Sequence, residues 1–394
     1  MQQPFKLSFD DTKTAFAYQS DQALRRARWV FTAMGHEWLV RLGCRLAPWA
    51  LRCHLPVEGL IRRTVFQLFC GGETLPEAGA TARLLSGYGV GAILDYGVEA
   101  ATGEERYDEA TRAFLGAVDY AGTQSAIPFI SLKITAFAPF SLLEKIHRHE
   151  TLSADEEAAF QRVRRRMRDI AERASRTGTG VLIDAEQSWI QGPVDALAME
   201  MMRLFNRASP VVYNTYQLYL SARGRVLERD WEKARAEGYV LGAKLVRGAY
   251  LEKENARSEQ LGLPPVTQPS KQATDEAYDA ALRFAVDHLQ QGLAVVIGTH
   301  NEASSMLAAR LMHARGLAHG HPHAHFSQLF GMSDHITFNL ARAGYRVSKY
   351  LPYGPVREVL PYLIRRAREN AAISGQLGRE LPLVREELRR RKLL

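Results

Sequence analysis

The sequence predicts an α/β fold, a distorted (β/α)8 TIM-type barrel with an N-terminal helical region and a C-terminal helix. Short apolar runs of strand length alternate with helix-length stretches over most of the 394 residues. Eight such strand–helix pairs in succession predict a closed parallel barrel. A doubly wound open sheet is the alternative, and it is disfavoured because no G-x-G-x-x-G follows an early strand.

The predicted strands are short apolar runs with polar or charged residues near their ends. They are Ala92–Tyr96, Pro128–Ile134, Gly180–Asp184, Val211–Gln217, Gly242–Val246, Ala294–Gly298, His325–Leu329 and Tyr345–Lys349. The predicted helices between them include Ala154–Ser175, Val194–Phe205, Ser221–Glu237, Asp275–Gln291 and Asn301–Ala314. We expect a helical region over residues 1–85, the barrel over 86–375 and a basic helix over 376–394.

Two amphipathic segments flank the predicted barrel. Apolar residues recur at helical spacing over Ala23–Leu55 and include Trp29, Trp38 and Trp49. Such a helix can form a membrane or partner surface, but it is more often a packing face, which we expect here. The tail Leu383–Leu394 is basic with interleaved apolar residues, so it can dock on anionic lipid or pack on the barrel as a solvated helix.

Charge and cysteine content narrow the class of protein. The net charge is +8, which would suit a nucleic-acid or acidic-membrane partner, but it is spread along the chain, so no nucleic acid is expected. Cys44, Cys53 and Cys70 form no C-x-x-C and fit a reducing compartment. No secretory signal begins the chain, and no apolar run reaches the ~18 residues of a membrane span. A cytoplasmic protein is expected, with peripheral contact with an inner membrane left open.

Polar side chains gather where the predicted strands end, and barrel enzymes build their sites at these ends. The residues are Asp95, Lys133, Asp184 with Glu186, Gln217, Lys244 with Arg247, Thr299 with His300, Gln328, and Lys349 with Tyr350. So many charged or hydrogen-bonding ends favour a functional site. Opposite charges among them could also form ion pairs that only stabilise the barrel.

The last predicted strand leads through Pro352–Pro355 into a helix, in which Pro361 predicts a kink or a restart. Beyond it, a phenol, two guanidiniums and a carboxylate share one helical face at Tyr362, Arg365, Arg366 and Glu369. A solvated face is the common interpretation of such a pattern. Here the flanking residues are apolar, which argues against a solvated face. The planar, charged guanidinium of arginine suits a carboxylate ligand.

This region resembles the final strand and helix of proline dehydrogenases, which are FAD enzymes built on a distorted (β/α)8 barrel. The matching residues here are Tyr350, Tyr362–Arg366 and Glu369–Asn370. Further matching pieces follow in barrel order: LDYGVE (94–99), the strand ending in Lys133, IDAE (183–186), KLVRGAY (244–250), GTHN (298–301) and QLFGMSD (328–334). The resemblance covers most of the chain to Ala372 and is closest to stand-alone members of the mitochondrial-type branch.

The resemblance implies oxidation of L-proline to Δ1-pyrroline-5-carboxylate, with hydride passing to flavin N5 and electrons leaving to a quinone. Arg365 and Arg366 would clamp the proline carboxylate, with Lys133 as a third cation. The catalytic residues would be Asp184, which pairs with Lys133 or otherwise orders the site, and Lys244, which lies where many relatives carry Arg near N5. The wall of the apolar ring would be Tyr250, Leu329, Tyr350 and Tyr362.

For FAD, the resemblance carries over to Ala185, Gln217, Lys244, Arg247, Gly248, Ala249, Thr299 and His300. Gln217 would meet the polar edge of the flavin and Arg247 the pyrophosphate. Gly248 would allow close backbone approach, so Gly248→Val is expected to give folded protein with little FAD. Glu369 would hold a sugar hydroxyl or one of the arginines.

Three further interpretations are weighed against this one. A barrel aldolase could use Lys133 or Lys244 as a Schiff base. A nucleic-acid binder rests on net charge alone. The alternating histidines His319, His321, His323 and His325 resemble a metal site, but Gly320 and Pro322 indicate a solvated loop, so no catalytic metal is expected.

Overall fold

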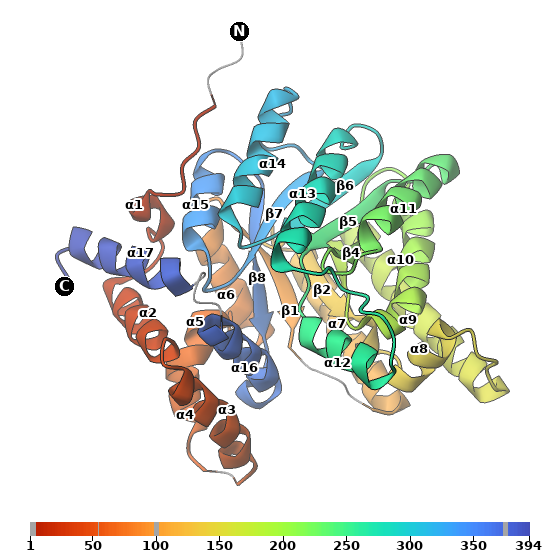
Figure 1. The fold of residues 1–394 in the computed structure, drawn as a ribbon, viewed down its shortest axis with the longest axis horizontal. Helices are drawn as coiled ribbons and strands as arrows, with labels where there is room; N and C mark the ends of the chain where they lie inside the picture. Colours follow the sequence, from red (N-terminus) through yellow and green to blue (C-terminus); the bar gives the residue numbers. More distant parts are fainter. Residues whose placement is uncertain (1–4, 54, 98–101, 373–376) are drawn as a thin grey trace. The chain divides into compact units, whose positions relative to one another are not determined.

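The computed structural model describes residues 5–53, 55–97, 102–372 and 377–394, with side chains described for all of these except 370–372 and 377–378. Its strands form one closed parallel barrel in chain order (Figure 1). They are β1 (Gly91–Tyr96), β2 (Phe129–Lys133), β3 (Gly180–Asp184), β4 (Val212–Gln217), β5 (Leu241–Val246), β6 (Leu293–Gly298), β7 (Ala324–Leu329) and β8 (Val347–Tyr353). The predicted (β/α)8 fold is confirmed.

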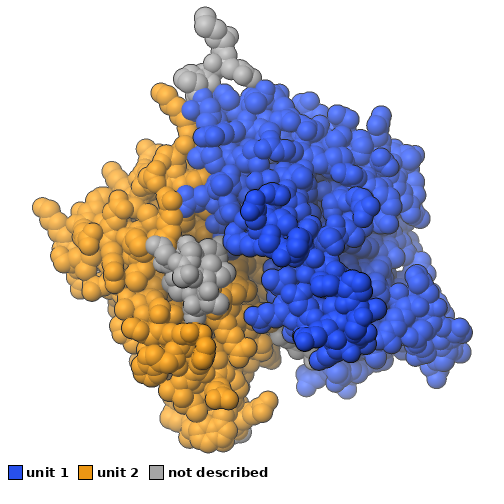
Figure 2. All heavy atoms as spheres, viewed as in Figure 1, with its two compact units in different colours: residues 1–5, 100–327 blue, residues 6–99, 328–394 orange. Residues whose placement is uncertain are grey.

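The chain groups into two compact units, coloured separately in Figure 2. Unit 1 comprises residues 1–5 and 100–327, and unit 2 comprises residues 6–99 and 328–394. The division into a helical region (1–85), a barrel (86–375) and a basic tail (376–394) stays a prediction. Its limit at residue 375 lies outside the described residues.

Unit 1 holds β2 to β6 and most of β7. Its helices are α7 (Glu104–Gly122), α8 (Phe140–His147), α9 (Ala154–Thr177), α10 (Gln191–Phe205), α11 (Arg223–Glu237), α12 (Leu251–Gln260), α13 (Lys271–Asp287) and α14 (Glu302–Ala314), with 3-10 turns η2 (Ile134–Ala136) and η3 (Ser188–Ile190). The start of α9 is an example of how the sequence fixes where a helix begins. Ser153 accepts from the Glu156 amide while the Glu156 carboxylate accepts from the Ser153 amide, which forms a capping box.

The strands of unit 1 are level at their carboxyl ends. In the parallel register Lys133 lies opposite Asp184, and Gln217 lies opposite Val246. The strands are buried along their length except at the last residue of several of them, as expected when both faces of a parallel sheet are covered. The polar residues predicted at the ends of β2 to β5 therefore lie at one edge of this sheet.

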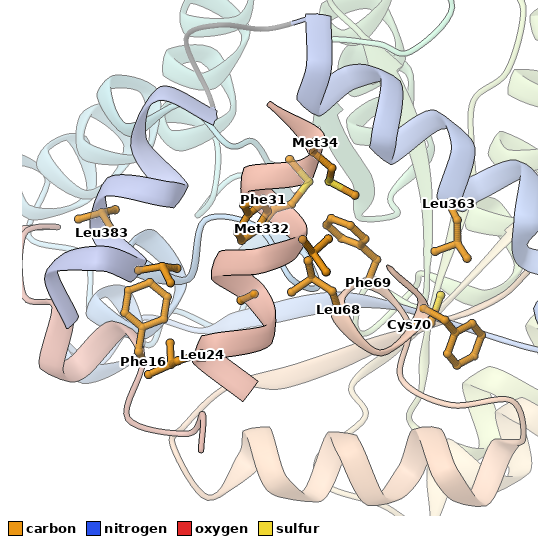
Figure 3. Close-up of a cluster of buried hydrophobic side chains, with 14 of the residues drawn as sticks. Phe16, Leu24, Phe31, Met34, Leu68, Phe69, Cys70, Met332, Leu363 and Leu383 are labelled. Carbon is orange, nitrogen blue, oxygen red and sulfur yellow. The ribbon is translucent and has the colours of Figure 1, made fainter. Parts of the chain in front are cut away.

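Unit 2 pairs β1 with β8 and surrounds them with helices. The helices are α1 (Thr12–Ala15), α2 (Asp21–Met34), α3 (Glu37–Arg52), α4 (Glu58–Ile61), the π-helical turn η1 (Arg62–Phe66), α5 (Gln67–Phe69), α6 (Leu75–Ser86), α15 (Asp334–Arg342), α16 (Val356–Ala372) and α17 (Leu377–Arg390). Figure 3 shows the hydrophobic core of unit 2. Five different segments contribute to it, with the residues Phe31, Phe69, Met332, Leu363 and Leu383.

The C-terminal tail is part of this core. Leu383, Val384 and Leu388 of α17 are buried in the cluster with α2. These apolar residues are therefore not presented to lipid, and of the two options for the tail the structure favours a helix packed on the protein.

The tryptophans of the N-terminal helices contradict our expectation of a packing face. Trp29, Trp38 and Trp49 are 61%, 64% and 57% exposed. The core side of α2 is made instead by residues such as Leu24 and Phe31. Helical spacing predicted the helices correctly, but α3 has apolar residues on two faces, and only one of them is covered.

The last strand is longer than predicted. β8 continues to Tyr353, through the Pro352 that was predicted to begin a turn. Pro352 lacks an amide donor, but its carbonyl accepts from the Gly71 amide at 2.8 Å, and the Tyr353 carbonyl accepts from Gly97 at 2.9 Å. α16 then begins at Val356 and runs on past Pro361, so the helix does not restart there.

None of the described helices has both the length and the apolar character needed to cross a membrane.

Candidate active site

A buried ion pair joins β3 and β5 of unit 1. Lys244 of β5 contacts the Asp184 carboxylate at the end of β3, and their side chains are 10% and 15% exposed. Ser131 of β2 donates to the same carboxylate oxygen at 2.7 Å. The two residues predicted to be catalytic are thus held together.

A second carboxylate lies beside this pair. Thr135 donates to the Glu186 carboxylate at 2.7 Å, and the Gln217 amide donates to the Glu186 carbonyl at 2.7 Å. Burial raises the pKa of Glu186 and the Asp184 charge adds to the rise, while the Thr135 hydrogen bond and the Lys133 charge oppose it. Gln217 is a buried residue, and its side-chain oxygen takes part in none of the described hydrogen bonds.

Arg247, just after β5, is held by three side chains. It donates to Asp275 at 2.6 Å, to Thr299 at 2.8 Å and to Ser304 at 3.0 Å. Its guanidinium also lies 4.4 Å from the centre of the Tyr278 ring. Burial alone would raise the pKa of Asp275, but hydrogen bonds from Lys271 and Arg247 outweigh burial and lower it. A guanidinium has five N–H donors, so the hydrogen bonds to described residues leave two for a further anion.

The loop after β5 needs a glycine for a local reason. Gly248 has φ +128°, and a Cβ there would lie 1.7 Å from the Tyr219 ring. Tyr219 in turn donates to Glu254 at 3.4 Å. Gly248→Val should therefore disturb this loop itself, and the expectation of an undisturbed fold with little FAD is replaced by one of lost local structure.

In unit 2, α16 carries a buried guanidinium. Arg366 is 8% exposed, donates to Glu369 at 2.5 Å and lies 5.2 Å from the centre of the Tyr362 ring. Among the described residues, neither its Nε nor the buried Tyr362 hydroxyl has a hydrogen-bond partner. Burial raises the pKa of Glu369, which Arg366 and Arg365 oppose. The predicted face of α16 is therefore not a solvated surface at Arg366.

Lys349, predicted at a strand end, has a structural place instead. Because β8 is longer than predicted, Lys349 is its third residue and is fully buried. It pairs with Asp334 at 2.7 Å and donates to the Met332 carbonyl at 2.5 Å. Tyr18 and Gln19 donate to the other Asp334 oxygen. This network ties the start of the chain to β8.

Most of the remaining predicted residues lie at or just beyond strand and helix ends: Lys133, Ala185, Ala249, Tyr250, Thr299 and His300 in unit 1, and Leu329 in unit 2. Tyr350 lies within β8 and Arg365 within α16, both in unit 2. Lys253 lies 5.5 Å from the centre of the Tyr250 ring. Of the matched motifs, Val98, Glu99 and the Asn370 side chain lie outside what the structure describes.

The histidine loop forms local contacts. His321 accepts from the His323 amide at 3.2 Å, and the His325 ring meets Phe129 edge-on at 4.9 Å. Within the described part of the chain, no group of three or more His, Cys, Asp or Glu side chains is arranged to hold a metal ion.

The supporting side chains Ser131, Thr135, Asp275, Tyr278 and Ser304 were missed by the sequence analysis. Ser131 had a usable signal, because it lies two residues before Lys133 on the same face of a strand. Asp275, Tyr278 and Ser304 lie on α13 and α14, where nothing in the local sequence connects them to Arg247.

Charged and amide side chains at the carboxyl ends of the strands place the chain in the class of barrel enzymes, which assemble their active sites at that end.

Comparisons with known proteins identify the family. The family model "Proline dehydrogenase" matches residues 78–379. The carbapenem antibiotics biosynthesis protein CarD of Pectobacterium carotovorum is 35% identical over 352 residues, which cover 89% of this chain and 91% of CarD. The human mitochondrial proline dehydrogenase 1 is 41% identical over 239 residues, covering 60% of this chain and 40% of the human protein.

A solved structure agrees on the fold. Proline utilization A (PutA) of Bdellovibrio bacteriovorus superposes with a TM-score of 0.70 at 18% identity, covering 94% of this chain and 39% of PutA. The chain belongs to the proline dehydrogenase family, and it is accordingly an oxidoreductase acting on proline. The aldolase and the nucleic-acid binder gain no support.

Proposed function

We propose that this protein oxidises L-proline to Δ1-pyrroline-5-carboxylate with bound FAD and passes the electrons to a quinone. The observation that carries the proposal is Arg366, a buried cation with an unused donor. Leaving a buried donor unsatisfied costs about 1–3 kcal/mol, more for a charged group. A substrate carboxylate that reaches this guanidinium would supply an acceptor, and a second negative charge beside that of Glu369.

Unit 2 provides the groups that recognise proline. Glu369 fixes Arg366 from one side, so the guanidinium is oriented before a ligand arrives. The Tyr362 hydroxyl offers a second buried polar group next to it. Arg365 is the second arm of the clamp, while Leu329 and Tyr350 suit the apolar ring of proline.

Unit 1 has a donor set that fits FAD. Beyond their described hydrogen bonds, Arg247 has two N–H donors for a phosphate, and Gln217 has its amide oxygen for the polar edge of a flavin ring. Gly248 is exposed and has no side chain, so a ligand can approach its backbone. His300, Thr299, Ala249 and Ala185 complete the set proposed to hold the cofactor, with Glu369 assigned either to a sugar hydroxyl or to the arginine it contacts.

The oxidation removes two electrons and two hydrogens from the bond between C5 and nitrogen of proline, and that bond becomes C=N. FAD, when bound, accepts the electron pair. The Lys244 ammonium on β5 would favour an electron-rich acceptor beside it, and Asp184 keeps this ammonium in place. Lys133 at the end of β2 adds a further cation for the carboxylate.

The test is the visible spectrum of the purified full-length protein. A yellow protein whose flavin absorption bleaches on anaerobic addition of L-proline, and recovers with a quinone, supports the proposal. A flavin that L-proline does not bleach contradicts the substrate assignment. A colourless protein that cannot be loaded with FAD contradicts the cofactor assignment.

A further inference from the structure

Helix α3 is apolar on two faces. Its buried residues are Val40, Ala50 and Leu51, and Val40 belongs to the core cluster of unit 2. A second set of apolar side chains is exposed on the same helix: Trp38, Leu39, Leu42, Leu46 and Trp49. A helix whose outer face is solvated would carry polar residues there, so packing within the chain does not explain this set.

The exposed set is continuous along the helix. Trp38, Leu42, Leu46 and Trp49 follow one another at intervals of four, four and three residues, which places them in one row. The two tryptophans are 64% and 57% exposed, at opposite ends of the row. At about 1.5 Å per residue the row extends over roughly 16 Å. We call Trp38, Leu39, Leu42, Leu46 and Trp49 the outer face of α3.

Arginines border this face. Arg41, Arg45 and Arg52 are exposed, and the helical spacing puts all three on the same side of the row. Glu37 is the acidic residue of α3, and it pairs with Arg41 at 2.6 Å. Apolar and tryptophan side chains flanked by arginine are the pattern of a helix lying in the interface of an anionic bilayer.

We propose that the outer face of α3 docks the protein on an anionic lipid surface, with the leucines and tryptophans entering the headgroup region and the arginines meeting lipid phosphates. The charge favours lipid over a second copy of the chain. A two-fold contact through this face would bring the same arginines together from both copies. The inference does not rest on the proposed reaction, because docking is a property of the resting protein.

The experiment is sedimentation of the full-length protein with vesicles, made either of equal parts phosphatidylglycerol and phosphatidylcholine or of phosphatidylcholine alone. The wild type should bind the anionic vesicles, and more weakly as salt is raised. Leu42→Ser with Leu46→Ser should weaken binding by about tenfold or more. The matched control is Leu261→Ser with Leu263→Ser, which removes two exposed leucines of unit 1 and should leave binding unchanged.

The charge is tested separately. Arg45→Gln with Arg52→Gln should weaken binding to anionic vesicles by about tenfold. Arg225→Gln with Arg283→Gln, which changes two exposed arginines of unit 1, serves as its control. Unfolding temperatures of all variants establish that they are folded.

Three results would overturn the proposal. The first is a wild type that fails to bind anionic vesicles at all, and the second is a Leu42/Leu46 variant that binds them as well as the wild type does. The third is a wild-type dimer that this variant converts to a monomer without any vesicle binding, because the face would then be covered by a second copy.

Discussion

The ionic clusters of the two units differ in how completely they are satisfied. In unit 1, Lys244 meets Asp184, and Arg247 has a partner in each of Asp275, Thr299 and Ser304. In unit 2, Arg366 has one carboxylate partner and a buried Nε with none among the described residues. A satisfied pair stabilises the fold and holds a charge in position, whereas a buried donor without a partner carries a cost in free energy that a ligand able to reach it would remove. The two clusters should therefore respond differently to mutation.

The largest effect is expected on stability, at the satisfied pair. Asp184→Asn or Lys244→Met leaves one buried charge uncompensated and should lower the free energy of unfolding by ~3 kcal/mol. The double variant should lose less than the sum of the two. Equilibrium urea unfolding measures all three.

Asp119→Asn is the control for this pair, because it breaks the exposed Asp119–Arg173 pair and should cost no more than ~1 kcal/mol. Equal costs for the two pairs would show that the Lys244–Asp184 contact does not stabilise the fold.

A smaller effect is expected on substrate choice. Tyr350→Ser opens the wall proposed for the proline ring without touching the carboxylate. It should shift the ratio of kcat/KM for hydroxyproline over L-proline upward by up to about tenfold. Steady-state kinetics with both substrates measure it. A lower kcat/KM for both substrates at an unchanged ratio would mean that Tyr350 does not border the ring.

The smallest effect concerns Glu186 and pH. Its folded pKa is raised above the ordinary value of 4.5. The contribution of the protonated carboxyl is therefore complete below pH 4.5 and is lost as the pH rises through the raised pKa. Glu186→Gln stays neutral, so its unfolding temperature relative to the wild type should increase from pH 4.5 towards neutrality. A difference that is constant or falls with pH would contradict the assignment.

The barrel could be predicted from the sequence because each strand is a short apolar run buried on both faces. The length of β8 could not be predicted, because Pro352 is typical of a turn in the sequence. In the structure its carbonyl accepts a hydrogen bond from the Gly71 amide, and the strand continues. The polar strand ends were predicted as a group. The contact between Lys244 and Asp184 was not predicted, because sequence order does not reveal that Lys244 on β5 reaches Asp184.

The two apolar faces of α3 are a second example of what the sequence could not reveal. Spacing predicts that a helix is amphipathic, but it does not tell which apolar face the protein covers. The face with Val40 is buried, and the face with Trp38 and Trp49 is exposed. At Arg366 the fold covers a side chain whose helical pattern is usually that of a solvated face. This burial is what distinguishes Arg366 from an ordinary surface arginine.

The central claim is that Arg366 binds the substrate carboxylate, and the most direct test compares Arg366→Met with Arg368→Met. Arg368 lies on the same helix but is exposed. A charge-assisted hydrogen bond is worth ~1.5–3 kcal/mol, so kcat/KM for L-proline should fall by about tenfold or more in Arg366→Met, with flavin content kept. Arg365→Met should behave like Arg366→Met, and Arg368→Met like the wild type. Near-normal kcat/KM in both Arg365→Met and Arg366→Met would contradict the account.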